Sequence, residues 1–222
     1  MKNSIVLVSG GLDSCVVAAI AASNNENISF LHVNYGQLTE KKELDCFNNI
    51  AEYYNVKRKL VVDISHLKDI GGSCLTDHTI DVPNANLDSD CIPVSYVPFR
   101  NANILAIATS WAEIINANTI YIGAVEEDSS GYPDCRREFY DAFEQCIKIG
   151  TKPKTKIKIK TPLINLSKKE IVIKGKELDA PLHSTWGCYK SNNKPCNKCD
   201  SCCLRKRGFD KAGFTDPLEE IH

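Results

Sequence analysis

The sequence predicts an α/β fold in which a doubly wound parallel sheet is covered by helices. Two observations carry this prediction. Runs of β-branched residues alternate with helix-like segments along most of the chain, and the first run ends in a glycine pair that leads directly into an apolar helical pattern. Alternating strands and helices form right-handed units, which place helices on both faces of a parallel sheet. Ligands of such folds bind at the carboxyl ends of the strands.

The expected strands are short runs rich in β-branched residues. They comprise residues 4–8, 28–33, 60–63 and 119–125. A further run, residues 152–160, carries a lysine at every second position. Because lysine side chains deter pairing between sheet edges, this run is expected to form an edge strand with a charged outer face. Nucleic-acid binding is the alternative for these lysines.

Helices are expected where apolar residues recur every three or four positions. These segments are residues 15–22, 44–54, 101–117 and 135–149. Ser167-Lys168-Lys169-Glu170 has the spacing of a capping box, which predicts another helix that runs to about residue 178 before Pro181 stops it.

Residues 64–97 form a stretch without clear periodicity that contains Gly71, Gly72, Pro83 and Pro93. Stretches of this length inside a compact domain are usually functional or disordered. We expect a mobile cover over the ligand site, and a disordered excursion is the alternative.

The composition limits the class of protein. The 222 residues are 43% hydrophobic, which suffices for one core and a small appendage. Lysine and arginine total 27 against 28 acidic residues, and this balance argues against a protein that mainly coats a polyanion. No apolar run approaches membrane-spanning length, and no signal peptide is expected. Eleven cysteines without secretory features predict reduced thiols in the cytoplasm.

A glycine turn, Val8-Ser9-Gly10-Gly11-Leu12-Asp13-Ser14, follows the first strand. The N–H groups of such a turn and the dipole of the next helix favour a bound phosphate, and the glycines allow close approach. Ser9 and Ser14 add hydroxyl donors. Asp13 cannot attract phosphate, so it is expected to cap the helix or to bind Mg²⁺. A purely structural turn is the alternative.

The order Ser-Gly-Gly-x-Asp-Ser resembles the pyrophosphate loop (PP-loop) of ATP-dependent adenylating enzymes, whereas no Gly-Lys-Ser/Thr of a Walker loop follows. The resemblance implies a Rossmann-like sheet of the PP-loop type and ATP, with Mg²⁺, as cofactor. It also implies that residues 8–14 hold the β,γ-pyrophosphate while a substrate oxygen attacks the α-phosphorus.

Four cysteines near the C-terminus, Cys188, Cys196, Cys199 and Cys202, have the spacing C-x7-C-x2-C-x2-C. Four thiolates complete the tetrahedral coordination of a structural zinc ion and leave no open position. A segment of about 40 residues has too little core to fold without such a link. We therefore expect an ATP-binding α/β domain over residues 1–182 and a small zinc-binding segment over residues 183–222.

Two alternatives to zinc stay open. An iron–sulfur cluster also uses C-x2-C-x2-C runs, and the thiols could lie reduced in an ordinary loop. Cys203 is expected outside the site, since a helix turns it about 100° from Cys202. Cys15, Cys46 and Cys146 fall in apolar helical patterns and are expected in the core. A catalytic cysteine is not expected, because no histidine pattern accompanies one.

Several motifs, in order along nearly the full chain, narrow the resemblance. Besides the glycine turn they are Tyr35-Gly36-Gln37, Val97-Pro98-Phe99-Arg100-Asn101, Gly131-Tyr132-Pro133-Asp134-Cys135-Arg136, Leu166-Ser167-Lys168 and the cysteine segment into Leu204-Arg205. The chain resembles the 7-cyano-7-deazaguanine synthase family, which forms a nitrile in queuosine biosynthesis. The Gly-Tyr-Pro-Asp-Cys-Arg motif and the cysteine segment make this resemblance much more specific than the glycine turn alone.

The resemblance implies a ligase that forms C–N bonds. In its reaction the carboxylate of 7-carboxy-7-deazaguanine attacks ATP at the α-phosphorus, and ammonia displaces AMP to give the amide. A second ATP activates the amide oxygen, and elimination leaves the nitrile. The implied partners are this substrate and ammonia, in a homodimer that binds neither nucleic acid nor membrane.

The resemblance also suggests site residues. Lys168 matches a lysine of the family and would neutralise the leaving pyrophosphate; an exposed surface lysine is the alternative. Arg100, at a helix entrance, could clamp phosphate or carboxylate, with a surface ion pair as the alternative. One carboxylate is expected to accept the two N–H donors of the guanine-like base, and which one does so stays open. The candidates for substrate contact are Asn101, Glu127, Asp128, Asp134 and Arg136.

Two other functions fit parts of the sequence. A PP-loop enzyme that thiolates or amidates a tRNA base would need a larger basic surface and usually a catalytic cysteine pair, so the near-neutral charge disfavours it. A zinc ribbon that binds RNA without catalysis would leave the glycine turn and the α/β core without purpose. The ammonia source and the oligomeric state are not visible in the sequence.

Overall fold

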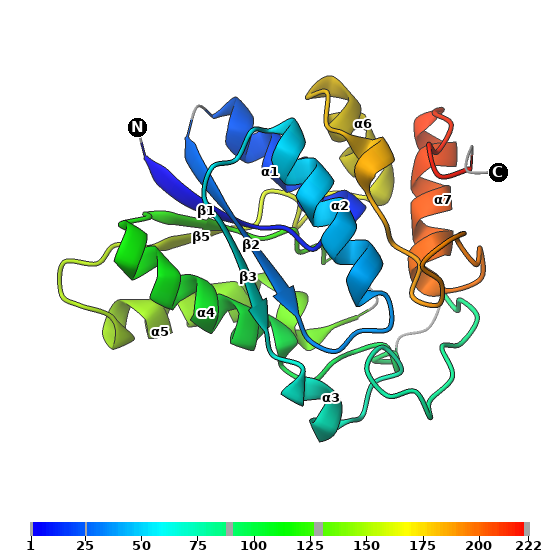
Figure 1. Cartoon of the computed structure of the whole chain (residues 1–222), viewed down its shortest axis with the longest axis horizontal. Helices are drawn as coiled ribbons and strands as arrows, with labels where there is room; N and C mark the ends of the chain where they lie inside the picture. Colours follow the sequence, from blue (N-terminus) through cyan, green and yellow to red (C-terminus); the bar gives the residue numbers. More distant parts are fainter. Residues whose placement is uncertain (1, 25, 88–90, 127–130, 220–222) are drawn as a thin grey trace.

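The computed structural model describes residues 2–24, 26–87, 91–126 and 131–219. Figure 1 shows a central sheet between two groups of helices, with the C-terminal helix packed at one side. The sheet has five parallel strands in the order β3-β2-β1-β4-β5. This arrangement confirms the predicted doubly wound parallel sheet.

The strands lie where the β-branched runs predicted them. They are β1 (Asn3–Leu7), β2 (Asn27–Asn34), β3 (Lys59–Asp63), β4 (Thr119–Tyr121) and β5 (Lys158–Lys160). β4 is shorter than the run 119–125, since its pairing with β1 ends at Val6 and Tyr121. β5 is the expected edge strand, although only its last three residues pair; Ile159 is buried between two exposed lysines.

Helices connect the strands and follow the periodic segments. They are α1 (Leu12–Ser23), α2 (Glu40–Tyr53), α3 (His66–Ile70), α4 (Arg100–Ile115), α5 (Arg137–Gly150), α6 (Lys168–Glu177) and α7 (Asp200–Ala212). Short 3-10 turns span Pro133–Cys135 and Leu182–Ser184. Among the described residues, every helix is too short or too polar to span a lipid bilayer.

Alternate residues of β1 point to opposite faces of the sheet, which gives the protein two cores. Val6 packs in the core formed with α1, α2, α6 and α7, where Val16, Phe47, Ile171 and Phe209 are buried. Ile5 packs in the other core, which includes Leu105 of α4 and Tyr140 of α5. Figure 1 shows the first group of helices above the sheet and α4 and α5 below it.

Two helix starts bear on the site. Ser167 and Glu170 form the predicted capping box of α6, in which the Ser167 N–H donates to Glu170 Oε2 over 2.8 Å. α4 has an unusual N-cap, Phe99, whose φ of 56° lies in the left-handed region that bulky side chains rarely adopt. The carboxylate of Asp134 accepts the Asn101 N–H over 2.9 Å and so satisfies the start of α4 from outside.

The described residues of the stretch 64–97 are an ordered part of the fold. They include α3, and Cys74, Leu75 and Val82 are buried in the core with α4 and α5. The Ala85 N–H donates to the Lys198 carbonyl over 2.7 Å, which ties this stretch to the C-terminal segment. The disordered alternative is therefore wrong for these residues, while a covering motion stays a prediction.

The expected burial of the helical cysteines holds in two of three cases. Cys15 and Cys46 are buried, whereas Cys146 is exposed. The prediction for Cys146 is wrong because α5 buries Tyr140 and Ile147, and the turn of the helix directs Cys146 away from that face. None of the eleven cysteines, all of which lie among the described residues, is in a disulfide.

A buried ion pair between Arg205 and Asp216 holds the C-terminal segment together internally. The Arg205 guanidinium donates to both carboxylate oxygens of Asp216, over 2.7 and 2.8 Å, and to Thr185 Oγ1 over 2.8 Å. The Trp186 N–H donates to the Gly10 carbonyl over 2.9 Å, so the segment reaches the glycine turn itself. The boundary predicted between residues 182 and 183 stays a prediction.

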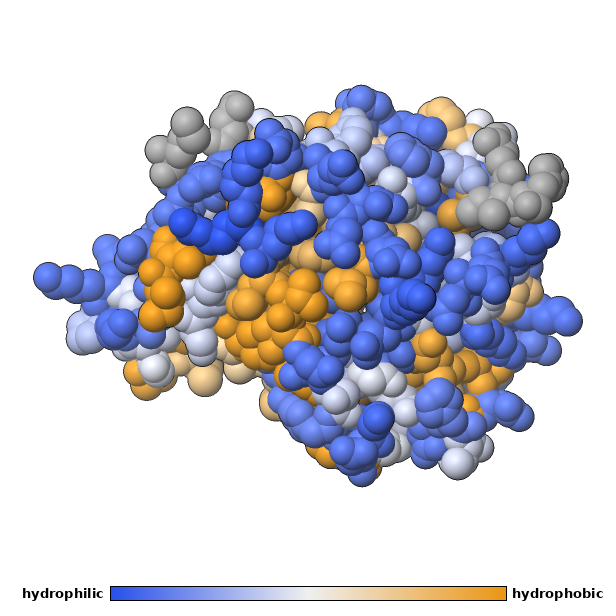
Figure 2. All heavy atoms as spheres, viewed as in Figure 1, coloured by the Kyte–Doolittle hydropathy of each residue, from blue (hydrophilic) through white to orange (hydrophobic). Residues whose placement is uncertain are grey.

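Figure 2 shows hydrophilic residues over most of one face, with an apolar patch in the part of the view where Figure 1 draws β3. Val61 of β3 is 44% exposed, and Ile114 of α4 is 74% exposed. Patches of this kind mark candidate contact surfaces.

Candidate active site

A cleft of about 310 Å³ lies at the carboxyl ends of β1, β2 and β4. β1 has its sequence neighbour β2 on one side and β4 on the other, so the cleft lies at the switch point of the sheet, where such folds bind ligands. Its lining brings together residues that are far apart in sequence: the glycine turn, Arg100, Lys168 and Trp186.

The glycine turn is held in shape by its own serines. The Ser9 N–H donates to Ser14 Oγ over 3.2 Å, and Ser14 Oγ donates to the Gly11 carbonyl over 3.0 Å. The Gly11 N–H in turn donates to Ser9 Oγ over 3.2 Å. Val8 and the turn residues line the cleft apart from Gly10. The hydroxyl groups expected to serve phosphate are thus engaged within the turn in this state.

Gly10 and Gly123 let neighbouring backbones approach this turn. Gly10 has a φ of 90°, and a side chain there would collide with the Glu43 carbonyl oxygen of α2. A Cβ on Gly123, just after β4, would lie 3.1 Å from the Asp13 carbonyl carbon and the Ser14 nitrogen. Both α2 and the segment after β4 therefore pack closely against the turn. The sequence analysis missed Gly123, whose role depends on this long-range contact.

Asp13 and Lys168 meet at the mouth of the turn. Lys168 Nζ donates to Asp13 Oδ2 over 2.6 Å, and the two side chains are only 13% and 27% exposed. The other carboxylate oxygen, Oδ1, is buried and has no hydrogen-bond partner among the described residues. Gly11 is the N-cap of α1, so the capping role considered for Asp13 is wrong. The alternative that Lys168 is an exposed surface lysine is also wrong, because its side chain is mostly buried.

Gly208 of α7 determines how closely the C-terminal helix approaches Lys168. A Cβ at this position would lie 2.9 Å from the Lys168 Cβ and 3.1 Å from its carbonyl oxygen. α7 therefore packs directly against the first turn of α6. Gly208 is a second positioning residue that sequence reasoning missed.

Arg100, the first residue of α4, faces the cleft. Its Nη1 donates to the Tyr35 hydroxyl over 2.9 Å, and its guanidinium lies 4.9 Å from the centre of the Tyr35 ring. The Tyr35 phenol is buried, and this desolvation raises its pKa, with the Arg100 charge opposing the shift. The interaction links the two motifs that contain these residues.

Of the residues expected to contact the substrate, only some lie at the cleft. Asn101 lines the cleft, and its Nδ2 also donates to the Asp134 carbonyl over 2.9 Å. Asp134 is buried behind the lining, where desolvation raises its pKa against the Asn101 hydrogen bond and the Arg100 charge. Arg136 lies on the surface and pairs with Glu138 at 3.7 Å. Glu127 and Asp128 lie outside the described residues.

A carboxylate and several aromatic residues line the cleft in addition to the expected residues. They are Glu43, Tyr132, Tyr140, Trp186 and Tyr189. Glu43 could have been found in the sequence, because it precedes Cys46 and Phe47 at helical spacing and so carries an acidic group on the buried face of α2. The Trp186 Nε1–H donates to the Ser191 carbonyl over 3.0 Å, which fixes its ring.

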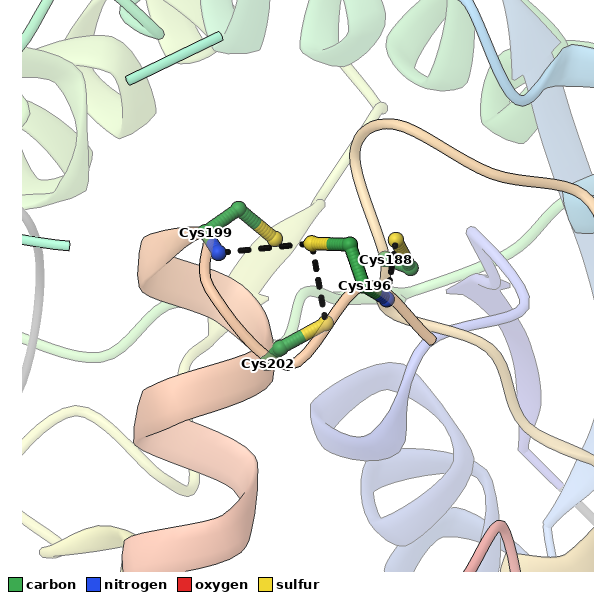
Figure 3. Close-up of side chains that lie close together, drawn as sticks. All are labelled: Cys188, Cys196, Cys199 and Cys202. Carbon is green, nitrogen blue, oxygen red and sulfur yellow. Dashed lines mark hydrogen bonds between the residues drawn. The ribbon is translucent and has the colours of Figure 1, made fainter. Parts of the chain in front are cut away.

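The four expected cysteines form one cluster, shown in Figure 3. Their four Sγ atoms all lie within 4.8 Å of one another, and the sulfurs of Cys196 and Cys202 are 3.9 Å apart. Tetrahedral ligands at about 2.3 Å from a zinc ion are about 3.8 Å from each other. The sulfurs thus have the spacing that a tetrahedral metal site requires.

Backbone and thiol groups favour the thiolate form of Cys188 in this cluster. The thiols of Cys199 and Cys202 and the N–H groups of Cys196 and Lys190 donate to Cys188 Sγ and hold the pKa of Cys188 well below its usual range. Cys203 lies outside the cluster, as expected, with its Sγ 3.9 Å from the Asn197 carbonyl.

Comparisons with known proteins agree with this fold and motif set. The family model for queuosine biosynthesis protein QueC matches residues 3–213. The chain is 56% identical to 7-cyano-7-deazaguanine synthase from Chlorobaculum parvum and 57% identical to that from Chlorobaculum tepidum. Each match spans 217 residues and covers 98% of this chain and 96% of the relative.

Two solved structures share the fold at low identity. A predicted subunit of tRNA methyltransferase from Methanocaldococcus jannaschii has a TM-score of 0.52 at 16% identity, over 80% of this chain and 75% of that chain. A 4-thiouridine synthetase in complex with RNA and bound ATP also has a TM-score of 0.52 at 16% identity, over 96% of this chain and 50% of that chain.

The sheet order and the glycine turn at its switch point define a doubly wound α/β protein with a ligand cleft at the carboxyl ends of its strands. Within that class, the chain belongs to the family of queuosine biosynthesis protein QueC, the 7-cyano-7-deazaguanine synthases. Membership confirms the enzyme class that the motifs indicated, an ATP-dependent synthase of queuosine biosynthesis. It also removes the tRNA-thiolating enzyme and the RNA-binding zinc ribbon as alternatives.

Proposed function

We propose that the protein converts 7-carboxy-7-deazaguanine and ammonia into 7-cyano-7-deazaguanine and splits ATP into AMP and pyrophosphate in each of two activation steps. One observation carries the proposal: the glycine turn, Lys168 and Arg100 line a single cleft at the switch point. The cleft thus combines groups for the phosphates of ATP with a cation for a carboxylate substrate.

Phosphate binding is proposed for the turn from Val8 to Ser14, with Lys168 beside it. The start of α1 supplies a positive helix end. The buried, unpartnered Oδ1 of Asp13 fits a Mg²⁺ ligand, and the ion would neutralise charge on the pyrophosphate. When phosphate enters, Lys168 is proposed to move from Asp13 to the departing pyrophosphate, because both Lys168 and Asp13 line the cleft beside the glycine turn.

The same phosphate-binding turn is proposed to serve both steps. Neither the carboxylate oxygen nor the amide oxygen leaves readily at neutral pH, and adenylation turns each into a good leaving group. The contribution of the protein is to hold the attacking oxygen near the α-phosphorus and to neutralise the developing charge. The cleft that the glycine turn lines can serve both adenylation steps if the amide intermediate stays bound or binds again after release.

Arg100 is proposed to hold the substrate carboxylate. Its Nη1 is used by Tyr35, and a guanidinium has further N–H donors for a planar anion. Contact with substrate is also proposed for Asn101, which lines the cleft. Asp134 would act through the start of α4 that it holds, while surface-exposed Arg136 has no support from the cleft lining.

Structural zinc is proposed for the site formed by Cys188, Cys196, Cys199 and Cys202. The sulfur spacing and the all-thiolate donor set suit tetrahedral zinc. Four protein ligands leave no position for substrate, so the ion would hold the C-terminal segment against the cleft. The same donor set is compatible with iron–sulfur chemistry, which the metal content distinguishes.

A homodimer and a cytoplasmic location complete the proposal. Exposed apolar residues such as Ile114 and Ile149 offer surface for contact between two copies. Eleven cysteines with no disulfide among the described residues agree with a reducing compartment. No direct contact with nucleic acid is proposed.

The nucleotide products test the proposed reaction. The purified protein, incubated with ATP, Mg²⁺, ammonium and 7-carboxy-7-deazaguanine, is predicted to release AMP and pyrophosphate, two of each per nitrile. Mass spectrometry should detect the carboxamide first, and added carboxamide should become nitrile with one ATP. Formation of ADP and phosphate would contradict attack on the α-phosphorus, and an amide that never becomes nitrile would contradict the synthase activity.

The Lys168→Ala variant is predicted to lose about 100-fold or more in kcat/KM, because a positioned cation at developing charge contributes a factor of this size. Its stability should change by less than about 2 kcal/mol, since Asp13 is partly exposed and can be hydrated. Steady-state kinetics and urea denaturation measure the two effects. Lys169→Ala, the exposed neighbour, is the matched control; equal activity of the two variants would refute the proposed role.

The metal content tests the zinc proposal. The intact protein is predicted to contain about one zinc ion per chain, and Cys199→Ala should bind much less and expose residues 183–222 to proteolysis, because structural zinc contributes about 10–16 kcal/mol in small finger peptides. Cys203→Ala is the control and should retain the metal. A brown protein with visible absorbance and bound iron would overturn the assignment.

A further inference from the structure

We propose that Glu43 recognises the donor edge of the deazaguanine ring, by accepting its ring N–H and its exocyclic amino group with the two carboxylate oxygens. This inference rests on the proposed function and specifies the substrate end of the same cleft. It names the residue that separates the guanine-like substrate from analogues that lack the amino group.

The position of Glu43 in the lining of the cleft supports this proposal. Among the described residues, the carboxylates that line the cleft are Asp13 and Glu43. Asp13 is bound to Lys168 at the phosphate end. Asp134 is buried behind the lining and already accepts the Asn101 N–H. Glu43 is therefore the lining carboxylate that remains for the base.

The orientation of the Glu43 carboxylate is fixed by the turn before α2. Thr39 Oγ1 donates to its Oε1 over 2.7 Å, and Gln37 Nε2 donates to its Oε2 over 3.1 Å. Gln37 is itself held, because its Oε1 accepts the Tyr35 N–H over 2.9 Å. Each carboxylate oxygen has a second lone pair, so one acceptor position per oxygen is left for a ligand.

The chemistry of the two rings favours the deazaguanine over the adenine of ATP. A guanine-like ring presents a ring N–H and an amino group side by side, and a carboxylate accepts both. The corresponding edge of adenine places an acceptor nitrogen beside its amino group, and a carboxylate lone pair would repel that nitrogen. The donor pattern of the substrate thus matches Glu43 and the pattern of ATP does not.

The surroundings of Glu43 suit a planar, apolar ring with one polar edge. Tyr35, Leu75, Tyr132 and Tyr189 line the same cleft and offer aromatic and aliphatic surface. Burial raises the pKa of Glu43, while the hydrogen bonds from Thr39 and Gln37 and the Arg100 charge favour its ionised form. A desolvated carboxylate gains more from a donor pair than an exposed one does.

The experiment compares 7-carboxy-7-deazaguanine with its analogue that lacks the exocyclic amino group. The unaltered protein is expected to prefer the first by about 10- to 100-fold in kcat/KM, the ratio that one unmatched buried acceptor produces. Glu43→Gln should lose most of this preference while its KM for ATP stays within about twofold. Glu52→Gln, an exposed glutamate of the same helix, is the matched control and should keep the full preference.

Several outcomes would overturn the inference. An unchanged preference in active Glu43→Gln would do so, and so would a rise in the KM for ATP alone, which would assign Glu43 to adenine. If Glu43→Gln does not fold, Thr39→Val tests the same point, because it removes the hydrogen bond that orients Glu43 Oε1. An undiminished preference for the amino-bearing substrate in this variant would contradict the inference. If the unaltered protein forms nitrile from neither compound, the proposed function itself fails.

Discussion

The site depends on the ion pair between Lys168 and Asp13, because two close backbone approaches, at Gly123 and Gly208, lie against these two residues. The 2.6 Å contact joins the first turn of α6 to the first turn of α1. Gly123 allows the end of β4 to press on the backbone of Asp13, and Gly208 allows α7 to press on Lys168. A cation at the mouth of the glycine turn, beside a carboxylate oxygen that has no hydrogen-bond partner among the described residues, would suit an anion and its metal ion.

The C-terminal segment is part of this arrangement rather than an appendage. Its helix α7 carries Gly208 and Arg205. Arg205 pairs with Asp216 and also donates to Thr185 Oγ1 and the Leu182 carbonyl, which ties the helix to the turn at residues 182–185. Trp186 reaches the carbonyl of Gly10 and lines the cleft. The cysteine cluster lies at the start of α7, so a metal ion bound there would fix the helix that positions Lys168.

Features that depend on neighbouring residues in the chain could be predicted from the sequence, whereas contacts between distant segments could not. The glycine turn, the capping box at Ser167 and the cysteine spacing each depend on residues close together in the chain, and the structure has all three. Gly123 and Gly208 matter through backbones that approach from elsewhere, which no local pattern reveals. The sequence places Glu43, an acidic residue, on the buried face of its helix, which is a detectable pattern. That Glu43 faces the cleft follows only from the packing of α2. Cys146 was misplaced because apolar spacing alone does not settle which side of α5 meets the sheet.

A crystal structure with an ATP analogue that cannot be cleaved between the α- and β-phosphates tests the central claim most directly. The account predicts that the β- and γ-phosphates bind at the turn from Ser9 to Ser14. Lys168 Nζ should then contact a phosphate oxygen instead of Asp13, and the Asp13 carboxylate should bind the Mg²⁺ ion. Phosphates bound away from this turn, or a nucleotide bound in the cleft while Lys168 stays on Asp13, would contradict it.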